Sequence, residues 1–189
     1  MMATGERRAR SWYPSLLVLC PTILLTAGAA REPAVFLALR RDPQAVAAGQ
    51  LWRLLSPVLV QADALEPGGW WRTGAVWLLV AAALAAGERV FGFGRTLGLY
   101  GLGALVGHGV GLLWQPYSAG CSVAGCGVLG ALALWVLLRA RVLQLKLGAS
   151  LVLALGVVTT LLRDIHGPPL LSGALLALWC ARRQLSAAV

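Results

Sequence analysis

Residues 120–138 read GCSVAGCGVLGALALWVLL and contain no charged side chain. A helix needs about 20 consecutive, mostly apolar residues to cross the hydrocarbon core of a bilayer. This run therefore predicts a transmembrane helix. Five further apolar runs predict five more spans, at Tyr13–Ala30, Trp70–Gly87, Leu97–Trp114, Leu147–Leu162 and His166–Cys180.

The composition agrees with a membrane protein. Of the 189 residues, 59% are hydrophobic and 12% are charged, and the mean hydropathy is +0.77. An ordinary soluble domain, with about 25% charged residues, is excluded. Six spans would use about 120 residues, so we expect residues 1–189 to form one all-α membrane domain. The four cysteines form no CxxC pair, which favours packing roles over disulfides or a metal site.

Two segments near the N-terminus need a separate interpretation. Tyr13–Ala30 follows three arginines and ends in TAGAA, a pattern that a cleaved secretory signal could also show. We interpret it as the first span because five more apolar runs follow it. Arg31–Gly69 contains apolar stretches that are too short and too interrupted to cross a bilayer. We expect this first loop to lie in the membrane interface.

The basic residues predict the orientation of the bundle. The net charge is +9, and the charges lie at the ends of spans, which suits lipid topology better than nucleic-acid binding. The N-terminus, second loop, fourth loop and C-terminus hold ten of the 16 Lys and Arg residues. These ten are Arg7, Arg8, Arg10, Arg89, Arg95, Arg139, Arg141, Lys146, Arg182 and Arg183. Both termini are therefore expected in the cytoplasm, and the Arg-rich composition favours a bacterial inner membrane.

Small residues recur on three of the predicted helices. Lipid gives helices no hydrophobic reason to associate, so they must pack through close backbone contact. The stripes predict a tight bundle but no particular function. They are Gly103, Gly107 and Gly111 in the third span, Gly120, Gly125, Gly127 and Gly130 in the fourth, and Gly173, Ala174 and Ala177 in the sixth.

Ionisable side chains within the membrane are costly and so point to function. The only two histidines, His108 and His166, both fall in apolar runs, and no Asp or Glu lies clearly inside a span. A carboxylate pair and an HExxH zinc site are therefore excluded, and we expect neither a metal nor a cofactor. A carrier or channel is disfavoured because the spans lack a polar pathway.

Ser122 and His166 form the one pair that could do chemistry together. The fourth and sixth spans run in the same direction, so both residues enter the bilayer from the outer side at similar depth. A serine hydroxyl with a histidine base is the smallest set that performs acyl transfer. The alternative is structural, with the serine bonded to a carbonyl one turn back and the histidine as a polar cap.

Four sequence motifs resemble those of the rhomboid intramembrane serine proteases. GCSVAGCGVLG at 120–130 is similar to the family's GxSGxxxGxxG, with Ser122 at the nucleophile. DIHGPPLLSG at 164–173 resembles the sixth-span histidine motif, with His166 and Gly173 in register. GQLWRLLSPVLVQ at 49–61 is similar to the WR-containing first loop, and GERVFGFGRTLGLY at 87–100 to the segment between the second and third spans. The resemblance implies a six-transmembrane-helix rhomboid-like bundle with an interfacial first loop.

The resemblance also implies an activity. Ser122 would attack a peptide bond of a transmembrane protein substrate presented from the lipid bilayer, and His166 would act as base and then as acid. No nucleic acid or cofactor would take part.

The chain departs from the family at the oxyanion site. The family's second-span HxxxN pair, which helps to bind the oxyanion, corresponds here to Arg72 and Val76. The candidates that remain for oxyanion or substrate binding are Gly120, Arg72 and Gln61, and His108 is a candidate for a supporting role. This departure keeps open an alternative, a catalytically inactive rhomboid-like protein that binds transmembrane segments.

Overall fold

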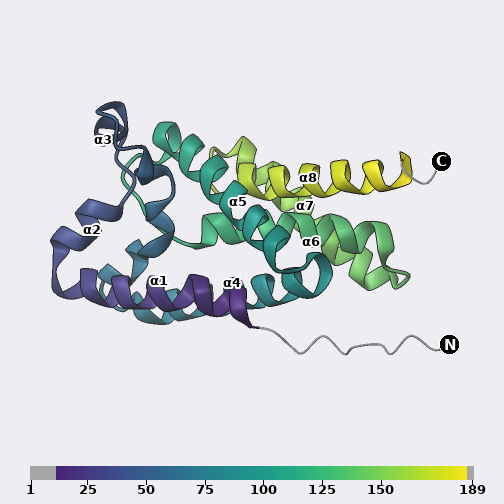
Figure 1. Cartoon of the computed structure of the whole chain (residues 1–189), viewed down its shortest axis with the longest axis horizontal. Coiled ribbons are helices and arrows are strands. Elements are labelled where there is room, and N and C mark those ends of the chain that lie inside the picture. The colour runs from purple at the N-terminus through teal and green to yellow at the C-terminus, as the bar shows by residue number, and fades with distance from the viewer. Residues whose placement is uncertain (1–11, 187–189) are drawn as a thin grey trace.

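The computed structural model describes the backbone of residues 12–186 and the side chains of residues 12–180 (Figure 1). All regular secondary structure in this part of the chain is helical. Five of its helices are long and apolar enough to cross a membrane, which confirms an all-α membrane protein. They are α1 (Tyr13–Arg31), α4 (Trp70–Phe91), α5 (Phe93–Trp114), α6 (Ser122–Arg139) and α7 (Leu143–Leu161).

The sixth expected span corresponds to α8 (Gly167–Ser186). Its apolar part, Gly167–Cys180, is shorter than the other five candidates. The helix begins at Gly167, so His166, where the sequence placed the start of the span, lies just outside it. Pro168 and Pro169 suit this start because proline fits the first turn of a helix. Of the basic residues that predicted the orientation, Arg7, Arg8 and Arg10 lie outside the described residues, as do the side chains of Arg182 and Arg183.

Helices α4 and α5 are longer than the apolar runs that predicted them. They continue through the polar residues between the two spans and are separated by Gly92 alone, whose φ of 84° lies in the left-handed region that favours glycine. Thr96 donates a hydrogen bond over 2.9 Å to the Gly92 carbonyl and so steadies this turn. Apolar content indicates which part of a helix lies in lipid, not where its hydrogen bonding ends. The apolar runs therefore predicted too short a helix for both α4 and α5.

Helix α6 is the centre of the bundle and packs against α4, α5, α7 and α8 (Figure 1). Glycines make these contacts close. A Cβ atom added at Gly103 would lie 2.6 Å from the Ala124 carbonyl oxygen, and one added at Gly173 would collide with the carbonyl of Gly127. The expected backbone-to-backbone packing is therefore confirmed for α5 and α8 against α6.

The long first loop folds into short helices that cannot span a bilayer. These are α2 (Pro33–Leu39), α3 (Pro43–Ala47), η1 (Leu51–Leu54), η2 (Ser56–Leu59) and η3 (Ala62–Leu65). Arg53 ties the loop together by donating to the carbonyl oxygens of Leu37 and Arg40 over 2.8 and 2.9 Å. Leu51 and Trp52 beside it are 64% and 57% exposed, the kind of surface that an interfacial segment presents to lipid.

Candidate active site

The candidate site lies where α6 and α8 begin. Ser122 is the first residue of α6, and His166 directly precedes α8. The two helices start at the same end of the bundle because α7 returns the chain between them, and their glycine-mediated contact holds these starts side by side. The chain thus brings together two residues that are 44 positions apart in sequence.

The Ser122 hydroxyl and the His166 ring lie within hydrogen-bond distance. Ser122 Oγ is 3.0 Å from His166 Nε2. On the other side of the ring, His166 Nδ1 is 2.7 Å from Asp164 Oδ1. A carboxylate only accepts hydrogen bonds, so Nδ1 carries the proton and a neutral His166 offers Nε2 as an acceptor to the serine.

Asp164 is a site residue that the sequence analysis missed. Besides the ring of His166, its Oδ1 atom accepts the backbone N–H of His166 over 2.8 Å. Both bonds are local, because an aspartate readily accepts from the backbone two residues ahead. The Asp-X-His spacing was the available signal, but Asp164 lies in the turn between α7 and α8 and not inside a span, where an ionisable side chain would point to function.

The turn that carries Asp164 and His166 is fixed by the end of α7. The Asp164 N–H donates to the Thr159 carbonyl over 2.8 Å, and the preceding Arg163 adopts a φ of 57°. Gly167 lies so close to α7 that a Cβ atom there would collide with Thr160. The position of His166 is thus set by backbone contacts as well as by its own side-chain bonds.

The Asp164 carboxylate is held in its ionised form. Partial burial raises its pKa, but the hydrogen bonds from the backbone and ring of His166 and the attraction to that ring outweigh the burial. The net effect holds the pKa of Asp164 below its usual value. At neutral pH the ring of His166 therefore faces a negative charge.

Two backbone amides before Ser122 are already hydrogen-bonded, whereas the amides of Ser122 and Val123 find no acceptor in their own helix. The Gly120 amide donates to the Pro57 carbonyl over 2.9 Å, and the Cys121 amide donates to Gln61 Oε1 over 3.2 Å. The amides of Ser122 and Val123 follow in the first turn of α6, where an α-helix has no carbonyl of its own to receive them. The positive end of the helix dipole adds to their ability to stabilise a negative charge.

Gln61 and Gly120 lie beside Ser122, whereas Arg72 has a different partner. Gln61 is 3% exposed, and its side-chain amide would lie 3.3 Å from a Cβ atom at Gly120. Arg72 forms an ion pair with Glu66 and is 45% exposed. Val76, at the other position of the family's pair, packs against the hydrophobic core around α6.

His108 belongs to a buried polar network that the sequence did not reveal. Its Nδ1 atom lies 2.8 Å from Nη1 of Arg41, which is fully buried and also donates to the Gln115 carbonyl. Burial lowers the pKa of Arg41 to about 10, so it stays charged at neutral pH. Since arginine only donates, a neutral His108 accepts at Nδ1 and carries its proton on Nε2. That nitrogen is buried.

The comparisons with known proteins agree with this architecture. The rhomboid protease GluP of Bacillus subtilis (strain 168) is 34% identical to this chain over 107 residues. The match covers 56% of this chain and 20% of that protein, so the chain corresponds to about a fifth of the relative's length. No protein-family model matches the chain, and no solved structure gives a significant match. The similarity to GluP, together with the helical membrane bundle, supports a rhomboid-like family for this chain.

Proposed function

We propose that the chain is an intramembrane serine endopeptidase of the rhomboid type, with Ser122 as nucleophile and His166 as general base. The observation that carries this proposal is the 3.0 Å separation of Ser122 Oγ and His166 Nε2. A hydroxyl is a poor nucleophile until a base within hydrogen-bond reach removes its proton. His166 presents the required lone pair because Asp164 occupies its other nitrogen.

The reaction follows from this geometry. His166 Nε2 takes the proton from Ser122 Oγ as the oxygen attacks the carbonyl carbon of the peptide bond. The imidazolium then gives that proton to the leaving amine, which leaves an acyl group on Ser122. A water molecule, deprotonated by His166, attacks this acyl group and restores the serine. Asp164 keeps the ring in one orientation and stabilises its positive charge in both steps.

The oxyanion that forms on the substrate carbonyl needs donors. The free amides of Ser122 and Val123 at the start of α6 supply these donors. In the family this role falls partly to His and Asn side chains, whose positions are occupied here by Arg72 and Val76. Removing one donor from such a site costs about 3–4 kcal/mol in transition-state stabilisation. Gln61 contributes indirectly, because its bond to the Cys121 amide fixes the backbone just before the nucleophile.

The substrate is a transmembrane or membrane-proximal segment of another protein. Ser122 and His166 lie at the ends of membrane helices, and His166 remains 40% exposed, so both water and a peptide can reach the pair. In the expected orientation this end faces outward and both termini are cytoplasmic, in a bacterial inner membrane.

An active-site probe tests the proposal. A fluorophosphonate should label the purified chain by phosphonylating Ser122 Oγ, and the label should be lost in Ser122→Ala. The matched control is Ser150→Ala, which removes an exposed hydroxyl from the apolar helix α7 and should leave labelling unchanged. The purified protein should also cleave a transmembrane substrate, and His166→Ala should not. Labelling that survives Ser122→Ala, or no labelling and no cleavage of any tested substrate, would favour the inactive, segment-binding alternative.

A further inference from the structure

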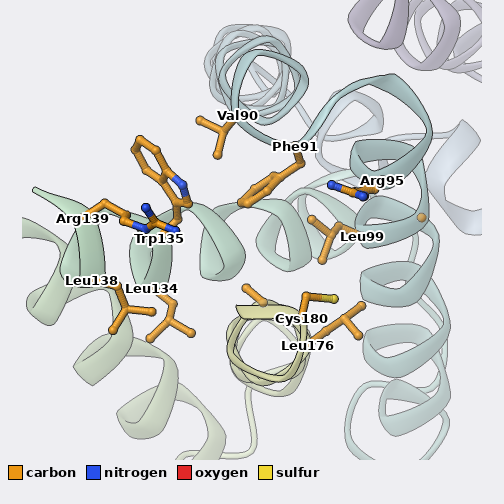
Figure 2. Close-up of a pocket in the computed structure, with 12 residues that line it drawn as sticks. Val90, Phe91, Arg95, Leu99, Leu134, Trp135, Leu138, Arg139, Leu176 and Cys180 are labelled. Carbon is orange, nitrogen blue, oxygen red and sulfur yellow. The ribbon is translucent and has the colours of Figure 1, made fainter. Parts of the chain in front are cut away.

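A cavity of about 540 Å³ lies at the opposite end of the bundle from Ser122 and His166. Figure 2 shows the side chains that line it. Its walls come from the end of α4, the start of α5, the end of α6 and the later part of α8. Arg139, which lines it, is the last residue of α6, whereas Ser122 is the first. At about 1.5 Å per residue, the length of α6 alone puts roughly 25 Å between the two sites.

Two arginines and many apolar side chains line this cavity. Figure 2 shows Arg95 and Arg139 on opposite sides of it, with Phe91 between them, Leu99 next to Arg95, and Leu176 lower in the view beside Cys180. Among the residues that the structure describes, no acidic side chain lines the cavity. Within residues 12–180, neither guanidinium forms an ion pair or a hydrogen bond, and both side chains are exposed. The cavity is therefore an apolar space bordered by two positive charges that lack a counter-ion.

The position of the cavity in the membrane limits what can fill it. It lies at the end of the bundle that also carries Arg89 and Arg141, so its mouth is at the depth of lipid headgroups. Basic pockets between membrane helices bind the headgroups of anionic lipids. A volume of 540 Å³ is within the range of small-molecule sites, and it accommodates part of an acyl chain beneath a phosphate.

We infer that the Arg95–Arg139 cavity binds an anionic phospholipid. The phosphate lies at the arginine-lined mouth of the cavity, where a planar guanidinium donates two hydrogen bonds to it at once. One acyl chain packs against Phe91, Leu99 and Leu176. The charges argue against the chain's own residues 181–189 as the occupant, because this segment contains two arginines and no acid. A second copy would bring the same positive charges to the cavity. The inference does not depend on the proposed proteolysis.

Native mass spectrometry of the full chain in a non-ionic detergent tests this directly. We expect phosphatidylglycerol to bind at a concentration about tenfold or more below that required for phosphatidylcholine with the same acyl chains. The variant Arg95→Gln/Arg139→Gln should lose this preference. Its matched control is Arg141→Gln/Lys146→Gln. This variant also removes two positive charges, from exposed positions at the same end of the bundle but outside the cavity. The control should keep the preference.

A second variant separates binding in the cavity from attraction to its mouth. Gly98 lines the cavity, and a Cβ atom at this position would have no neighbour within 4 Å. Gly98→Leu should therefore fill the acyl-chain space while both arginines remain, and should weaken phosphatidylglycerol binding. Glycerol phosphate, which has the anion but no chains, should not displace the lipid.

Four results would overturn the inference. Phosphatidylglycerol and phosphatidylcholine could bind equally, or neither could bind. The control pair could lose as much binding as the Arg95/Arg139 pair, which would mean general attraction to a basic surface. Gly98→Leu could bind as well as the wild type, which would mean that no chain enters the cavity. Circular dichroism of every variant establishes that the comparison is between folded proteins.

Discussion

The ring of His166 donates its Nδ1–H over 2.7 Å to the carboxylate of Asp164, which precedes it by two residues. The same carboxylate oxygen holds the His166 backbone amide. Because both bonds arise within one turn, the orientation of the ring is set locally, and only the approach to Ser122 depends on how the helices pack. The proposed active site therefore has an orienting carboxylate in addition to a serine and a histidine.

Asp164→Asn tests this positioning role. An amide can present either its oxygen or its NH₂ group to the ring, so the proton of His166 is no longer held on Nδ1. In a soluble triad this change costs about 10⁴-fold in kcat, and we expect about 10²- to 10⁴-fold here because the pair is partly exposed. KM should change little. The control Glu32→Gln makes the same change at a loop carboxylate and should leave kcat unaltered; an Asp164→Asn enzyme with normal kcat would remove Asp164 from the site.

Asp164 also predicts how stability depends on pH. Its pKa is lowered in the folded protein, so its interactions stabilise the fold fully at pH values above its unfolded pKa and are lost as the pH falls through the folded pKa. Thermal unfolding in detergent should therefore give the wild type a higher Tm than Asp164→Asn at neutral pH. This difference in Tm should shrink in strong acid. A difference in Tm that stays constant with pH would mean that the carboxylate's charge plays no part.

The sequence was informative where a feature depended on local composition. Apolar runs located the membrane helices, and glycine spacing located the faces at which α5, α6 and α8 meet. The alternation of helix direction was enough to put Ser122 and His166 at the same end, where the structure brings them within 3.0 Å.

Long-range partners could not be found in the same way. Arg41 resembles any loop arginine until the fold buries it against His108, 67 positions later. Arg72 occupies a position of the family's oxyanion pair, but its charge is paired with Glu66, which the family motif does not include. Asp164 is different, because it is a local partner that the Asp-X-His spacing could have indicated.

Gly173→Ala tests the contact that sets the site geometry. The added methyl group would collide with the Gly127 carbonyl and push α8 away from α6. Overpacking of this kind costs about 1–3 kcal/mol in the free energy of unfolding, and the displacement should also reduce the rate of fluorophosphonate labelling. Gly148→Ala is the matched control, because a Cβ atom there meets nothing within 4 Å and alanine favours a helix. Equal effects of the two substitutions would contradict the packing described for α6 and α8.

The buried Arg41–His108 pair should contribute to the stability of the fold. Arg41→Met should lower the free energy of unfolding by about 1–3 kcal/mol for each acceptor that it leaves without a donor, namely the Gln115 carbonyl and His108 Nδ1. Gly111 lies against the guanidinium, and a Cβ atom at this position would collide with it. Gly111→Ala should therefore destabilise the wild type.

In the Arg41→Ala background the same Gly111→Ala substitution should cost much less, because the side chain that it would strike is absent. Chemical denaturation of Gly111→Ala, Arg41→Ala and the double variant Arg41→Ala/Gly111→Ala, each compared with the wild type, gives this difference as a coupling energy. A coupling of about 1 kcal/mol or more would show that Gly111 is small in order to accommodate Arg41. If Gly111→Ala costs the same in both backgrounds, the guanidinium does not lie against Gly111 of α5.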